Sequence, residues 1–170
     1  RWAWFSVFIT QGLQADGNPT AGGLGALLTF AVIGVGALGC WAGGELGDRW
    51  GRGNTTSLAM LVSGGCAVLI GFMQSAPLPL VLLIGLVWGF AVVADSAQFS
   101  TVITELGDQS YVGTALTLQL AIGFVLTVPT LWLIPIVQHS YGWPAAFSLL
   151  AIGPVIGTVA MQKLKKYEQR

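Results

Sequence analysis

The sequence predicts an all-α membrane protein, a polytopic bundle of transmembrane helices. Hydrophobic residues make up 54% of its 170 residues and charged residues only 8%, whereas a soluble domain carries about a quarter charged residues because its surface faces water. The seven basic and seven acidic side chains give a formal charge of zero, so the chain lacks the basic footprint of a nucleic-acid binder. We therefore expect the lipid bilayer as a partner and no nucleic acid.

Five apolar stretches are long enough to cross a bilayer, whose hydrocarbon core of about 30 Å takes roughly 20 helical residues. They cover residues 22–43, 55–74, 78–104, 112–137 and 144–161. The segments between them are short and rich in Gly, Pro, Asn and Ser, which favour turns. The alternation of polar and apolar residues that marks a membrane β-barrel is absent from the sequence. Each stretch is therefore predicted to be a spanning helix.

The two ends of the chain differ from these five spans. Residues 1–11 form an apolar run of about half the required length, and the first residue is not Met. We interpret this run as the end of a spanning helix whose beginning is missing, so that the chain is a fragment. Residues 162–170 are polar and lysine-rich, and we expect them to form a cytoplasmic tail.

The basic residues predict the orientation in the membrane. They cluster after the first complete span and after the last one: Arg49, Arg52, Lys163, Lys165, Lys166 and Arg170. An even number of spans separates the two clusters, so both lie on one side, and the loops of the other side contain no Lys or Arg. Basic loops face the cytoplasm, which predicts an integral membrane protein with a cytoplasmic C-terminus.

The most specific local pattern is the run GELGDRWGRG at residues 44–53. We predict a cytoplasmic hairpin loop, because glycines permit a tight reversal and the charges suit a membrane surface. On charge alone, the run merely obeys the rule for basic loops. Its order, however, resembles the G-x-x-x-D-R-x-G-R-[RK] motif of the major facilitator superfamily of transporters. The matching residues are Gly44, Asp48, Arg49, Gly51 and Arg52, and Gly53 departs from the motif.

The resemblance covers the whole chain. The order of a partial helix, a loop, a helix, this motif and four further helices is that of one half of such a transporter. The run GWPAAF at residues 142–147 is similar to the G-W-R-x-A-F that begins the last helix of the superfamily. The resemblance implies a C-terminal six-helix half with five complete spans and a truncated first helix. It also implies that the missing N-terminal half is a partner and that the membrane is a bacterial cytoplasmic (inner) membrane.

The resemblance further implies a gate. In the superfamily, the Asp of the motif lies near the positive N-terminal end of a helix in the other half, and the arginines pair with an acidic helix end. Carried over, Asp48 biases the two halves toward one closed state. Arg49 or Arg52 would then pair with Glu105 or Asp108, which follow the 78–104 span on the same side.

Asp95 is the second candidate, because it lies deep in the 78–104 span. A charge there costs roughly 2.5–3.5 kcal/mol on insertion scales unless it faces water, pairs or is protonated. Helical spacing places Trp88, Asp95 and Gln98 on one arc, which we interpret as lining a substrate or proton pathway. The alternative is an Asp that is hydrogen-bonded between packed helices for structural reasons. Proton coupling, cation binding and substrate contact all stay open for Asp95.

Two further patterns concern the interior of the spans. Gln119 is a weaker candidate for the same pathway, since an amide within a span often only hydrogen-bonds a neighbouring helix. Gly39, Gly43 and Gly47 recur at four-residue spacing, the small-xxx-small pattern that lets two helix backbones approach closely.

The sequence carries no enzyme motif. It has no G-x-S-x-G, no H-E-x-x-H and no phosphate-loop lysine, and its two cysteines and one histidine form no metal-binding cluster. We expect no catalytic residue, no metal and no cofactor. The predicted function is secondary active transport of a small-molecule substrate by alternating access, with proton coupling as one option. The alternatives are a non-transporting channel or scaffold subunit, or a half-size transporter that acts as a dimer.

Overall fold

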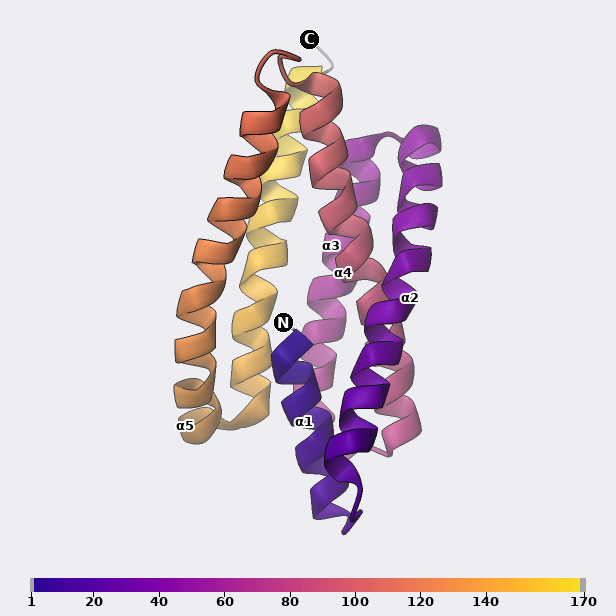
Figure 1. Cartoon of the computed structure of the whole chain (residues 1–170), viewed down its shortest axis with the longest axis vertical. Coiled ribbons are helices and arrows are strands. Elements are labelled where there is room, and N and C mark those ends of the chain that lie inside the picture. The colour runs from indigo at the N-terminus through magenta and orange to yellow at the C-terminus, as the bar shows by residue number, and fades with distance from the viewer. Residues whose placement is uncertain (1, 169–170) are drawn as a thin grey trace.

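The computed structural model of the chain is a bundle of helices (Figure 1), and it describes residues 2–168, with side-chain surroundings for 2–105 and 107–163. Its helices are α1 (Trp2–Ala15), α2 (Ala21–Trp50), α3 (Arg52–Phe72), α4 (Leu78–Leu106) and α5 (Val112–Glu168). Four of them, α2 to α5, are long and apolar enough to cross a membrane. No strand occurs among the described residues. The prediction of an all-α fold with several helices long and apolar enough to span a membrane is confirmed.

Helix α5 contains two of the predicted spans. Its 57 residues are interrupted at Gly142, whose φ of 79° and ψ of −178° are not helical. Glycine adopts a positive φ without the steric cost of a Cβ, and Pro144 follows where a proline suits a helix start. The chain therefore reverses here, and Figure 1 shows α5 as two adjacent arms. We call residues 112–141 the first arm and residues 143–168 the second arm.

The predicted hairpin loop at residues 44–53 is wrong in detail, because most of it is helical. Helix α2 continues to Trp50 and α3 begins at Arg52, so that the reversal takes place at Gly51 with φ 86° and ψ 143°. Glu45 and Arg49 form an ion pair across one helical turn, and such pairs stabilise a helix end at a water-exposed surface. The charged residues are therefore held on rigid helix ends.

Two predicted end segments also extend further as helices. Helix α1 runs to Ala15 and not to residue 11, and α5 continues to Glu168 through most of the expected tail at 162–170; residues 169–170 of that tail lie outside the described residues. Lys, Gln and Glu have good helix propensity, so a polar sequence can continue a helix beyond the bilayer. The apolar stretch therefore marks the part of a helix that can lie in the bilayer, and the helix itself can be longer.

The connections place the charged residues of the 44–53 run and Glu105 at one end of the bundle. Figure 1 shows the α2–α3 reversal, the turn from α4 to α5 and the last turns of α5 at the same end. We call it the Arg52 end, and the opposite end, where α1 stops and α5 reverses, the Gln11 end. Helix α4 packs against both α2 and α3, while α3 also packs against α5.

Glycines set the contact between α2 and α4. Gly39, Gly43 and Gly47 are all buried, and a Cβ added at Gly39 would collide with the carbonyl group of Phe90. A Cβ at Gly43 would lie 3.3 Å from the Cβ of Ala94. From the other side, Gly89 of α4 meets the backbone of Val32 in the same close way. The small-xxx-small pattern therefore marks the face of α2 that touches α4 backbone to backbone.

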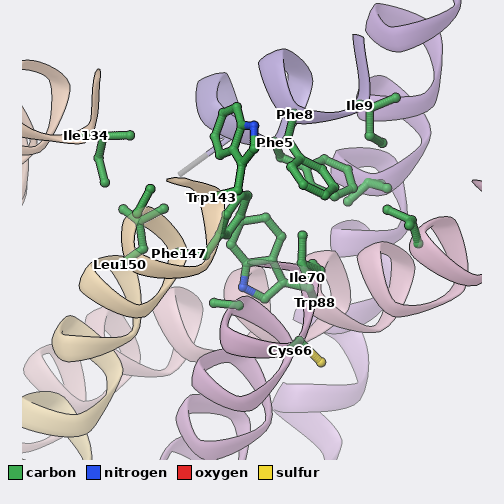
Figure 2. Close-up of a cluster of buried hydrophobic side chains, with 14 of the residues drawn as sticks. Phe5, Phe8, Ile9, Cys66, Ile70, Trp88, Ile134, Trp143, Phe147 and Leu150 are labelled. Atoms are coloured by element: carbon green, nitrogen blue, oxygen red, sulfur yellow. The ribbon is translucent and has the colours of Figure 1, made fainter. Parts of the chain in front are cut away.

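An aromatic cluster packs near the Gln11 end (Figure 2), formed by Phe5, Phe8, Trp88, Trp143 and Phe147. Ring centroids are 5.3–6.1 Å apart, mostly edge to face. Such pairs contribute about 0.5–1.5 kcal/mol each beyond their buried area. The cluster joins α1, α4 and the second arm of α5, and the indole N–H of Trp143 donates to the Gln11 side-chain oxygen at 3.1 Å.

We predict that Gly39→Leu destabilises the bundle whereas Gly65→Leu does not. A side chain at Gly39 meets the α4 backbone, which cannot move aside, and such overpacking costs roughly 1–3 kcal/mol or more. Gly65 in α3 has no atom within 4 Å of an added Cβ, so it controls for the gain in helix propensity. The measurement is the apparent melting temperature of each purified variant in detergent. Equal melting temperatures would contradict the proposed contact.

Candidate functional site

A cluster of charged side chains lies at the Arg52 end. The guanidinium of Arg52, the first residue of α3, donates to both carboxylate oxygens of Glu105 at 2.7 and 3.1 Å. The same group lies 2.7 Å from a carboxylate oxygen of Asp48. Only 20% of the Arg52 side chain is exposed. One guanidinium therefore joins the ends of α2, α3 and α4, and its planar fork suits such bidentate pairing better than a lysine would.

The structure distinguishes between the pairings that the sequence left open. Arg52 pairs with Glu105, while Arg49 pairs with Glu45 of its own helix at 2.6 Å and leaves 72% of its side chain exposed. Asp108 accepts a hydrogen bond from the backbone N–H of Ser110 at 2.9 Å and so shapes the turn before α5. Within the described residues, no ion pair joins Arg49 to Glu105 or either arginine to Asp108.

The glycines of the motif have different surroundings. Gly51 forms the reversal, and a Cβ at Gly44 would meet nothing within 4 Å. Gly47, one residue before Asp48, is the crowded position. A Cβ there would lie 2.8 Å from both an Arg52 nitrogen and the Gln98 side-chain oxygen. Its missing side chain leaves the space through which the guanidinium reaches into the bundle.

Gln98 receives this inward end of Arg52. The Nη1 group of Arg52 lies 3.4 Å from the Gln98 Oε1 atom, which accepts the hydrogen bond. Only 2% of Gln98 is exposed, so the contact extends the charged cluster from the surface into the interior. It joins residues that are 46 positions apart in the sequence.

Asp95 lies one helical turn from Gln98 on α4 and is 4% exposed. The Ser96 hydroxyl is 3.0 Å from a carboxylate oxygen of Asp95 and 3.0 Å from the carbonyl oxygen of Val92. A hydroxyl has one proton to donate, so Ser96 can serve only one of these acceptors at a time. Sequence reasoning missed Ser96, because periodicity places it on a different side of the helix from Asp95.

The predicted arc of Trp88, Asp95 and Gln98 faces the packed interior. Trp88 is fully buried in the aromatic cluster, where its ring contacts Phe5 and Phe147 (Figure 2). Helical periodicity identifies the side of α4 correctly but cannot tell a packed interface from an open cavity. In this conformation Trp88 is a packing residue, and a solute could reach it only after the helices move.

An open groove of about 490 Å³ lies on another side of α4, between α2 and the first arm of α5. Gln119 lines it together with Ser96, Ser100 and Thr127, and its remaining lining is apolar apart from Cys40. The Oε1 atom of Gln119 is buried without a hydrogen-bond partner. None of the lining residues carries a charge. Of the four predicted pathway residues, the groove thus contains Gln119 alone, and Ser96 connects it to Asp95.

A comparison with protein-family models, with characterised proteins and with solved structures finds no match. The described residues also contain no group of three His, Cys, Asp or Glu side chains that could hold a metal ion. The chemical groups of the candidate site are therefore the charged cluster, the buried carboxyl group of Asp95 and the groove.

We predict that Arg52→Gln lowers the apparent melting temperature by several degrees, whereas Arg49→Gln changes it little. Arg52 joins three helices and is mostly buried, so its loss leaves Asp48, Glu105 and Gln98 without their shared donor. Arg49 belongs to an exposed pair within one helix, and such pairs contribute little to stability. Both substitutions remove one positive charge, so the comparison controls for net charge. Equal effects would contradict the role of Arg52 in joining the helices.

Proposed function

We propose that this protein is one half of a secondary active transporter that moves a small solute across a bacterial cytoplasmic membrane by alternating access. The observation that carries the proposal is the charged cluster at the Arg52 end. Asp48 and Arg52 match the motif of the major facilitator superfamily, and they meet Glu105 at the ends of three helices. A loop whose basic residues served only to face the cytoplasm would not require Asp48, Arg52 and Glu105 to meet at the ends of three helices.

The cluster suits a gate because water competes for its bonds. Asp48 keeps 68% of its side chain exposed and Glu105 48%, so water can take the place of Arg52 at these carboxylates when the helices move. Asp48 also has exposed surface to offer to a helix N-terminus of a partner half, where a carboxylate is favoured. The cluster would thus hold one closed state without locking it permanently.

The proposal assigns the remaining candidates to the route of the solute and of a coupling ion. The groove that contains Gln119 provides hydroxyl and amide groups for an uncharged part of a solute. Asp95 is the buried carboxyl group next to this groove, and Ser96 contacts both. We assign Asp95 to the coupling ion, because a buried carboxyl group beside the groove can bind a proton or a cation during the cycle.

The first arm of α5 supports the presence of a partner half. Most of its side chains are exposed, including Leu126 at 64% and Trp132 at 76%. A spanning helix with so little packing within its own half is suited to face lipid on one side and a second bundle on the other. We assign that second bundle to an N-terminal half of the same transporter.

The test of this function is uptake by the full-length protein in proteoliposomes, with and without a pH gradient. The probes are radiolabelled sugars, amino acids and organic cations. We predict that Asp48→Asn lowers the uptake rate roughly tenfold, the effect of losing about 1.4 kcal/mol of coupling between gate states. Membrane insertion should stay intact because the shape of the side chain is kept.

Glu45→Gln is the matched control. It removes one negative charge from the same helix end, but its partner Arg49 belongs to an exposed pair outside the cluster, so uptake should stay near that of the unmodified protein. A failure to transport any of the probes would favour a channel or scaffold subunit. Equal uptake by Asp48→Asn and the unmodified protein would refute the gate.

A further inference from the structure

A slot of about 190 Å³ opens between α2 and α3 next to the Arg52 end, and α4 also lines it. Thr55 is its one polar lining residue, and no lining residue carries a charge. Apolar cavities of about 150 Å³ bind hydrocarbons such as benzene, so the slot has room for part of a hydrocarbon chain. Five of its ten lining residues are Gly or Ala, whose small size leaves this space: Ala42, Gly43, Ala59, Ala91 and Ala94.

The slot is separate from the groove that contains Gln119, because the two share no lining residue. Its apolar wall is uncovered, with Leu58 46% and Val62 37% exposed. Both residues follow Thr55 on α3 at helical spacing, so they extend along one face of the helix, away from the Arg52 end. When α2 and α3 span the bilayer, lipid is the medium that such an apolar opening meets.

Thr55 brings an unused hydroxyl group to the slot. The residue is 4% exposed, and its Oγ1 atom is buried without a hydrogen-bond partner among the described residues. A threonine in a helix commonly donates to the carbonyl oxygen one turn earlier, as the neighbouring Thr56 does to Arg52 at 2.8 Å. A buried hydroxyl that makes no such bond destabilises the protein. Thr55 therefore offers a donor for which the described chain supplies no acceptor.

The position of Thr55 along α3 identifies the acceptor that a bilayer supplies there. Thr55 follows Arg52 by three residues, a rise of about 4.5 Å along the helix axis. Arg52 belongs to the charged cluster, whose carboxylates are exposed to water. The headgroup layer of a bilayer is several Å deep on each side of the hydrocarbon core. Thr55 thus lies at the depth where the ester carbonyl groups of phospholipids join their acyl chains.

We propose that the slot binds one acyl chain of a bilayer phospholipid, whose ester carbonyl oxygen accepts a hydrogen bond from the Thr55 hydroxyl. From there the chain runs along Leu58 and Val62 toward the middle of the bilayer. It packs against both helices that carry Asp48 and Arg52, and so it stabilises the Arg52 end. The inference goes beyond the proposed transport function and does not depend on it, since it requires only that α2 to α4 span a membrane.

The experiment compares two lipids that differ only at the carbonyl group. The full-length protein in dodecyl maltoside, a detergent without an ester, is titrated with dioleoyl phosphatidylethanolamine or with its dialkyl ether analogue. The analogue keeps the headgroup and the chains but has CH₂ in place of each carbonyl group. Native mass spectrometry counts the bound lipids and gives their dissociation constants. We expect the ester lipid to bind about fivefold more tightly at the tightest site, the effect of one typical hydrogen bond.

Three variants test the hydrogen bond. Thr55→Val removes the hydroxyl but keeps a branched side chain, and it should abolish the preference for the ester lipid. Thr55→Ser keeps the hydroxyl and should keep the preference. Thr56→Val is the matched control, because it removes the neighbouring hydroxyl, which donates within its own helix. It should leave the preference unchanged.

Ala59→Leu tests the slot itself. The larger side chain fills part of the space, so the ester and the ether lipid should both bind roughly tenfold more weakly at this site. Ala26→Leu adds the same side chain at an exposed position of α2 outside the slot and should leave lipid binding unchanged. This pair of variants decides the question even if Thr55→Val folds poorly.

Equal affinity of the unmodified protein for the two lipids would overturn the proposed hydrogen bond, and so would an ester preference that survives in Thr55→Val. Lipid binding that is unchanged in Ala59→Leu would overturn the slot as the site of the chain. A change in the oligomeric mass of Ala59→Leu, with lipid binding intact, would assign the slot to a second protein chain instead. None of these results depends on uptake, so the transport function is tested separately.

Discussion

The close approach of α2 to α4 is the contact on which the rest of the site depends. Between helices in a bilayer, lipid is as apolar as the side chains, so the packing of small residues decides which helices associate. Gly39 and Gly43 bring the α2 backbone onto Phe90 and Ala94. At Gly47 the same face leaves a space that Arg52 fills on its way to Gln98. The charged cluster is thus a consequence of the glycine contact.

The two ends of the bundle are held by different interactions. At the Gln11 end, aromatic rings from α1, α4 and the second arm of α5 pack edge to face, which stabilises one arrangement strongly. At the Arg52 end, the pairs are exposed to water and screened by salt. Asp95 lies between these ends in the buried part of α4.

The sequence predicts the spans and the chemistry of the cluster but not how each helix is rotated about its own axis. The length of each apolar stretch, compared with the thickness of a bilayer, predicts the spans. The predicted side of the membrane limits the possible partners of Arg52 to Glu105 and Asp108. The contacts of Arg52 with Gln98 and of Trp143 with Gln11 join residues 46 and 132 positions apart. Apolar residues lie on all sides of these helices, so periodicity groups residues on one side of a helix but does not tell whether that side meets another helix, lipid or a cavity. For the same reason, Trp88 was expected on a pathway and lies in the aromatic cluster.

Reciprocal exposure of the two ends is the most direct test of alternating access. Ser110→Cys reports the Arg52 end and Ser75→Cys the Gln11 end, each in the full-length protein without Cys40 and Cys66. If Asp48 belongs to a gate as proposed, thiol labelling from both sides of the membrane should change in opposite directions in Asp48→Asn, with one reporter gaining exposure as the other loses it. Exposure that stays constant at both positions, or that rises at both together, would contradict a transporter and favour a scaffold or a channel.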